Sequence, residues 1–70
     1  MDEMDKNYIL KSIINNDFLA SETLSTISFK LLNDYPMNQL ERSLLILVIE
    51  HDNNLVENYK ELLKKLLKTY

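Results

Sequence analysis

The segment that decides the fold is RSLLILVIEHDNN, residues 42–54, which contains the longest apolar run in the chain. Six consecutive apolar residues, Leu44 to Ile49, are followed by a polar cluster that ends the run. A helix on the surface of a small protein needs a single apolar stripe, and a half-buried strand alternates apolar with polar residues. The segment fits neither pattern, so most of its surface must be covered, either by its own chain or by a second chain.

The composition favours helices over strands. The 70-residue chain contains no glycine, no cysteine and one proline. A β-protein of this size needs turns with positive φ, which glycine usually supplies. Helices joined by polar connections fit better, and three such connections are present: NND at 15–17, NDYP at 33–36 and HDNN at 51–54. We therefore predict a single all-α domain over residues 1–70, a small bundle of about four short helices.

The expected helices span four ranges: 3–15, 17–33, 37–51 and 54–69. The last is the clearest, because Leu and Tyr recur there at spacings of three and four residues. Asn38 with Glu41, and Asn54 with Glu57, resemble capping boxes at helix N-termini. A strand remains an alternative for the apolar run, and the sequence ISFKL also alternates like a strand.

A comparison of the sequence with itself suggests two helical hairpins of one pattern. A shift of 35 residues brings identical residues into register: Leu10/Leu45, Ile14/Ile49, Asp17/Asp52, Glu22/Glu57, and Lys30-Leu31-Leu32 with Lys65-Leu66-Leu67. Chance similarity in a chain rich in Leu and Ile is the alternative explanation. With this shift, the third segment carries the extra apolar residues Leu40, Ile46 and Leu47 where the first carries Asp5, Lys11 and Ser12.

The extra apolar surface of the third segment predicts a homodimer. A 70-residue domain buries only about 60% of its unfolded surface, so a second chain is a common source of additional stability. The expected dimer interface consists of Leu40, Leu44, Ile46, Leu47 and His51. A central helix that the other three helices surround is the alternative.

Signals of catalysis, cofactor binding or metal binding are scarce. Without glycine there is no phosphate-binding loop, and without cysteine there is no thiolate metal site. The only histidine, His51, lies between two acids at an expected helix end, where a cation near the helix dipole explains it. Glu22 and Glu57 fit first-turn acids. We therefore expect no enzyme activity, no cofactor and no metal.

The expected function is a non-catalytic protein–protein interaction module in the cytoplasm, without membrane contact. A homodimeric inhibitor, antirepressor or adaptor of bacterial or phage type fits this size and composition. The net charge is −3, and the first half of the chain is the acidic half. Candidate partner-binding residues are these acids and one aromatic anchor: Asp2, Glu3, Asp5, Asp17, Glu22 and Tyr35.

A small DNA-binding transcriptional regulator is the alternative function. The last segment carries a row of lysines that could contact phosphates: Lys60, Lys64, Lys65 and Lys68. Two observations weigh against nucleic acid as a partner. The chain is acidic overall, and Glu57 and Glu61 dilute the positive charge of the row.

Overall fold

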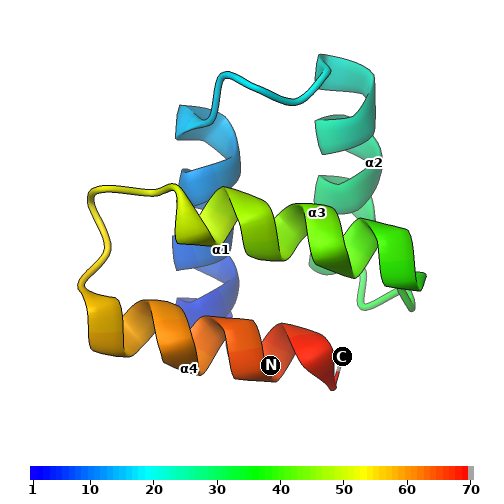
Figure 1. Ribbon diagram of the computed structural model, residues 1–70. Helices are drawn as coiled ribbons and strands as arrows, with labels where there is room; N and C mark the ends of the chain where they lie inside the picture. The colour runs from blue at the N-terminus through cyan, green and yellow to red at the C-terminus, as the bar shows by residue number, and fades with distance from the viewer. Residues whose placement is uncertain (70) are drawn as a thin grey trace.

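The computed structural model describes residues 1–69, and these residues form four α-helices and no strands (Figure 1). The helices are α1 (Glu3–Asn15), α2 (Ser21–Leu32), α3 (Gln39–Glu50) and α4 (Glu57–Lys68). In Figure 1, α1 and α2 form one antiparallel hairpin, and α3 and α4 form a second that crosses it. The predicted all-α bundle of four short helices is confirmed, and the apolar run of residues 44–49 is helical. None of the described helices is long and apolar enough to cross a membrane.

Side-chain caps fix the starts of α1 and α3. The Asp2 carboxylate accepts a hydrogen bond from the Asp5 N–H, 2.9 Å away. At α3, the Asn38 side chain accepts from the Glu41 N–H at 2.8 Å, and the Glu41 carboxylate accepts from the Asn38 N–H at 2.9 Å. This reciprocal pair is the predicted capping box, and it satisfies two backbone donors that a helix N-terminus leaves unpaired.

The starts of α2 and α4 differ from the prediction. Both helices begin later than expected, after the N-cap residues Ala20 and Val56, whose side chains make no capping hydrogen bond. The predicted capping box at Asn54 is wrong, because the Asn54 N–H donates to the Asp52 carboxylate at 2.8 Å. This local turn competes with helix formation, as short polar side chains often do.

The two hairpins repeat at a spacing of 36 residues, which corrects the shift of 35 inferred from the sequence. α2 and α4 have the same length, and their bounds differ by 36 at both ends. The capping residues Asp2 and Asn38 are also 36 apart. The same spacing relates Asn16 to Asp52, whose side chains accept from the N–H two residues further on. We refer to residues 1–36 and 37–69 as the first and second hairpins, and to positions 36 apart as equivalent.

The sequences of the two hairpins also match when they are compared at the spacing of 36 residues. MDEMDKNYILKSI, residues 1–13, is then equivalent to MNQLERSLLILVI, residues 37–49. Both stretches begin with Met and end with Ile, and most positions between them hold residues of similar shape: Asp2/Asn38, Glu3/Gln39, Met4/Leu40, Asp5/Glu41, Lys6/Arg42, Ile9/Leu45 and Leu10/Ile46. The two hairpins are therefore two versions of one 36-residue unit.

The core is built from equivalent positions of the two hairpins. In five pairs of equivalent positions, both residues are buried: Ile9/Leu45, Ser12/Val48, Ile13/Ile49, Ile27/Leu63 and Leu31/Leu67. α3 packs against both α4 and α1, and α1 also packs against α2. Because α3 has neighbours on two sides, the fold itself covers much of the apolar run that opened the sequence analysis.

Candidate functional site

The two interhelical connections meet at a cleft of about 370 Å³. All its lining residues fall into five pairs of equivalent positions: Ser12/Val48, Asn15/His51, Asn16/Asp52, Asp17/Asn53 and Phe18/Asn54. Corresponding parts of the two hairpins therefore face each other across this cleft. Across it, the rings of Phe18 and His51 lie 5.4 Å apart.

The polar groups of the cleft hold the two hairpins together. The buried Ser12 hydroxyl of α1 donates to the Asp52 carboxylate of the second connection. His51 directs its Nδ1 atom to the Leu47 carbonyl oxygen, 3.0 Å away within the same hairpin. In residues 1–69, no three His, Cys, Asp or Glu side chains are grouped closely enough to hold a metal ion. The Ser12–Asp52 contact in this cleft joins the two hairpins and so has a structural role.

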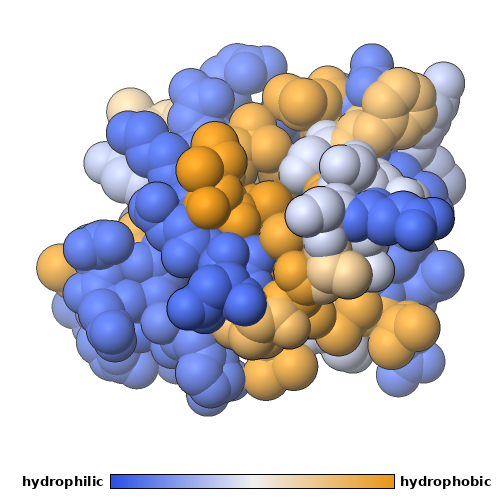
Figure 2. Space-filling model, turned by 90° about the horizontal axis from the view of Figure 1, so that it is seen from above, coloured by the Kyte–Doolittle hydropathy of each residue, from blue (hydrophilic) through white to orange (hydrophobic). Residues whose placement is uncertain are grey.

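A larger depression, of about 760 Å³, lies between α1 and α2, and we call it the α1–α2 groove. Its apolar lining is Ile13, Ile14, Leu19, Leu24, Phe29 and Leu32, and its polar lining is Asn16, Asp17, Ser21, Ser25 and Ser28. Three of the apolar side chains are largely exposed: Ile14 at 79%, Phe29 at 56% and Leu32 at 57%. Figure 2 shows hydrophobic side chains gathered over the half of the molecule that carries α2. The half beside the α3–α4 connection is mainly hydrophilic in the same view.

The second hairpin has no such apolar surface at the equivalent positions. The exposed residues Ile14, Phe29 and Leu32 of the first hairpin are equivalent to Glu50, Lys65 and Lys68. Because the second hairpin forms the same two helices with charged residues at these three places, we expect that folding of this unit does not require apolar side chains there. Contiguous exposed apolar surface on a soluble protein commonly marks a binding site. The α1–α2 groove is therefore our candidate site.

Sequence reasoning missed this groove. The shift of 35 residues placed Ile14 opposite Ile49 and Leu32 opposite Leu67, both of which are buried. With identical apolar residues opposite them, Ile14 and Leu32 gave no sign of exposure. A shift of 36 residues would have revealed the polar residues opposite Ile14 and Leu32.

The structure divides the predicted dimer-interface residues. Leu40, Leu47 and His51 are exposed, whereas Leu44 and Ile46 are partly buried against the core. The corrected register also changes the comparison behind the prediction. Leu40 is equivalent to Met4, which is equally exposed at 67%, and Ile46 is equivalent to the partly buried Leu10. Of the three extra apolar residues, only Leu47 still has a polar equivalent, Lys11.

The predicted acidic residues do not form one cluster. Asp2 and Asp5 belong to the start of α1, where Asp2 caps the helix and Asp5 accepts a hydrogen bond from the Tyr59 hydroxyl of α4. Burial, followed by this bond to Asp5, raises the pKa of Tyr59. Glu3 is exposed in the first turn of α1. Asp17 lies at the edge of the α1–α2 groove.

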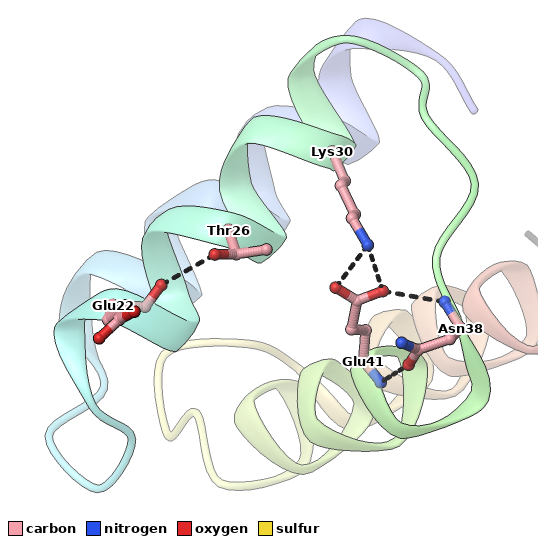
Figure 3. Close-up of polar contacts among 5 residues, drawn as sticks. All are labelled: Glu22, Thr26, Lys30, Asn38 and Glu41. Atoms are coloured by element: carbon pink, nitrogen blue, oxygen red, sulfur yellow. Dashed lines mark hydrogen bonds and ion pairs between the residues drawn. The ribbon is translucent and has the colours of Figure 1, made fainter.

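Glu22 and Tyr35 lie at opposite ends of α2. Glu22 is exposed in the first turn, where its backbone carbonyl accepts from the Thr26 hydroxyl at 3.1 Å (Figure 3). Tyr35 is exposed just after the helix, and its ring lies 5.5 Å from that of Phe29. The predicted aromatic anchor therefore adjoins a residue that lines the α1–α2 groove.

An ion pair ties α2 to the start of α3. The Lys30 ammonium reaches from α2 to both oxygens of the Glu41 carboxylate, at 2.8 Å each (Figure 3). The bond to Lys30, together with the Asn38 N–H, holds the pKa of Glu41 below its ordinary value. The contact joins the first hairpin to the second and anchors the capping box of α3 at the same carboxylate.

Two of the four candidate phosphate-binding lysines are already engaged. Lys60 is buried, and its ammonium donates to the Glu50 carbonyl oxygen at 3.0 Å. Lys64 pairs with Glu61 at 2.9 Å, which raises the pKa of Lys64 and lowers that of Glu61. Lys65 and Lys68 are exposed. The row therefore does not form a continuous cationic surface.

Comparisons with known proteins place the chain in no family: no protein-family model, curated protein or solved structure matches it.

Proposed function

We propose that this protein is a non-catalytic protein-interaction module of bacterial or phage type, and that it binds a protein partner through the α1–α2 groove. One observation carries the proposal. Where the first hairpin exposes Ile14, Phe29 and Leu32, the second hairpin has charged residues on the same backbone unit. Apolar side chains that the fold does not need are available to bind another molecule. An inhibitor, antirepressor or adaptor acts through such a surface.

Self-association through α3 is the second part of the proposal. Leu40 and Leu47 are exposed and lie seven residues apart, so they share one face of α3. Two α3 helices that pack around a twofold axis would bury these side chains against their symmetry mates. This face is separate from the α1–α2 groove, so a dimer would leave the groove open.

The DNA-binding alternative has less support. Phosphate contacts need lysine ammonium groups that point into solvent. Lys60 and Lys64 already hold the Glu50 carbonyl and the Glu61 carboxylate.

Affinity capture from the native host with a matched pair of variants tests the proposed function. Phe29→Lys/Leu32→Lys installs the residues that the second hairpin carries at the equivalent positions, so the fold should tolerate it. We expect the wild type to retain a discrete partner that this variant loses. The matched control Met4→Lys/Val56→Lys adds the same charge at two exposed apolar residues that lie outside the groove and outside the proposed α3 face, and it should retain the partner. The same proteins on all three baits would contradict a role for the groove.

A further inference from the structure

The two hairpins differ in charge as well as in exposed apolar surface. The first hairpin, residues 1–36, contains six acidic and three basic side chains, a net charge of −3. The second hairpin, residues 37–69, contains five of each and is neutral. The entire net charge of the protein therefore belongs to the hairpin that carries the α1–α2 groove.

Cations are absent from the groove lining, whereas acids lie at one end. The eleven lining residues include Asp17 and no Lys or Arg. Glu22 is exposed next to the lining residue Ser21, but it belongs to a neighbouring depression that Glu41 also lines, so it lies just outside the groove. A ligand in the groove would therefore meet an apolar floor and the carboxylate of Asp17, with Glu22 just beyond the lining at the N-terminal end of α2.

The dimensions of the groove fit a helix. Ser21, Ser25, Ser28 and Leu32 follow each other at spacings of four, three and four residues, so one face of α2 borders the groove along most of the helix. Eleven residues of helix extend over about 17 Å, which is the length of roughly three turns of a partner helix. Recognition of an amphipathic helix in an apolar groove needs such a length, with anchors every three to four residues.

From this combination we infer that the α1–α2 groove binds a basic amphipathic helix of a partner protein. Apolar residues of the partner would pack on Ile14, Phe29 and Leu32, and flanking Lys or Arg residues would lie near Asp17 and Glu22. The inference rests on the proposed function and adds the chemistry of the partner. Opposite charge at the rim would speed association and favour this class of helix over acidic ones.

A second copy of this chain fits the groove less well than a basic helix does. Two first hairpins packed groove to groove would bring the Asp17 carboxylate of each copy to the contact, with no Lys or Arg in either lining. Like charges in opposition disfavour such a pairing. Self-association through the groove is therefore an outcome that would overturn the inference.

Two synthetic peptides test the chemistry of the partner directly. One has Leu on a single helical face and Lys elsewhere over 16 residues or so, about four turns; the other has Glu in place of every Lys. Fluorescence anisotropy of labelled peptides measures their affinity for the wild-type protein. We expect the Lys peptide to bind at least tenfold more tightly than the Glu peptide. Equal affinity, or preference for the Glu peptide, would overturn the inference about charge.

Neutral variants locate the binding site on the protein. Phe29→Gln/Leu32→Gln removes apolar surface from the groove without a change of charge and should weaken binding of the Lys peptide at least tenfold. The control Met4→Gln/Val56→Gln, at two exposed apolar residues outside the groove and the proposed α3 face, should change it less than twofold. An unchanged affinity in the groove variant would overturn the assignment of the site. Conversion of a wild-type dimer to a monomer by this variant, seen by sedimentation, would assign the groove to self-association instead.

The acids at the rim have their own matched control. Asp17→Asn/Glu22→Gln should weaken binding of the Lys peptide and reduce its salt dependence. Glu50→Gln/Glu57→Gln, which removes the same charge from the second hairpin, should do so less. Equal effects would show that only the overall charge matters and would overturn specific contacts at the rim. A host partner that needs the groove but resembles the Glu peptide would overturn this inference and leave the proposed function standing.

Discussion

The first and second hairpins share a fold and a core but present different surfaces. The same five positions are buried in each hairpin. Three exposed apolar side chains of the first hairpin, in contrast, are equivalent to charged residues in the second. The buried positions thus specify the helical unit, and the exposed positions are free to differ. Since one hairpin serves as a control for the other, the comparison separates residues that fold the chain from residues available for binding.

The largest expected effect concerns the register of the repeat. Leu31 and Leu67 are equivalent and fully buried, so each change to Ala should lower the free energy of unfolding by about 2–5 kcal/mol. Leu32 is 57% exposed, and Leu32→Ala should change it by less than about 1 kcal/mol. Urea unfolding followed by circular dichroism measures all three. If Leu32→Ala lowered the free energy of unfolding more than Leu31→Ala does, the result would contradict the equivalence of positions 36 residues apart.

The next prediction concerns Leu47, whose equivalent in the first hairpin is Lys11. Leu47 is 41% exposed, and a fully buried leucine contributes about 1.5–3 kcal/mol. We expect the wild type to sediment as a dimer at micromolar concentration, with a melting temperature that rises with concentration. Leu47→Glu should give a monomer, whereas Lys11→Glu should leave the dimer intact. A monomeric wild type at all concentrations would contradict the α3 interface.

The caps of α1 and α3 offer a smaller comparison. Loss of a side-chain N-cap usually lowers stability by about 1 kcal/mol, which is the effect expected for Asp2→Ala. Asn38→Ala/Glu41→Ala should have the larger effect, because it removes the cap and also the Glu41 carboxylate that accepts from the Asn38 N–H and from Lys30. Thermal unfolding of the two variants checks the order. The reverse order would show that the capping box adds nothing to the simple cap.

The smallest expected effect depends on pH. The Lys30 ammonium and the Asn38 N–H lower the pKa of Glu41 in the folded protein. The resulting stabilisation is complete above the ordinary pKa of a glutamate, about 4.3, and is lost as the pH falls through the lower folded value. Glu41→Gln should therefore lose less stability than the wild type between pH 5 or so and pH 2. The equivalent change in the first hairpin is Asp5→Asn. It alters the acceptor of the Tyr59 hydroxyl and breaks no ion pair like that of Glu41 with Lys30.

Much of the fold was predictable from local sequence. The capping residues Asn38 and Glu41 mark the start of α3, and the absence of glycine favours helices over hairpin turns. The starts of α2 and α4 were not predictable, because Ala20 and Val56 have no capping side chain and the polar residues before them form turns instead.

The candidate site was harder to predict for a physical reason. An error of one residue in a helix rotates every side chain by about 100°, which moves a buried position to the surface. The shift of 35 therefore placed exposed Ile14 opposite buried Ile49. Only the bounds of the helices and the burial of their residues establish the register in which the two hairpins can be compared.

The most direct test of the central claim is the stability of a chain whose first hairpin carries the surface of the second. Ile14→Glu/Phe29→Lys/Leu32→Lys installs the three equivalent residues of the second hairpin. If these apolar side chains are available for binding and not needed for folding, the free energy of unfolding in urea should fall by less than about 1.5 kcal/mol. A loss of more than about 3 kcal/mol would show that the fold depends on them, and would contradict the account.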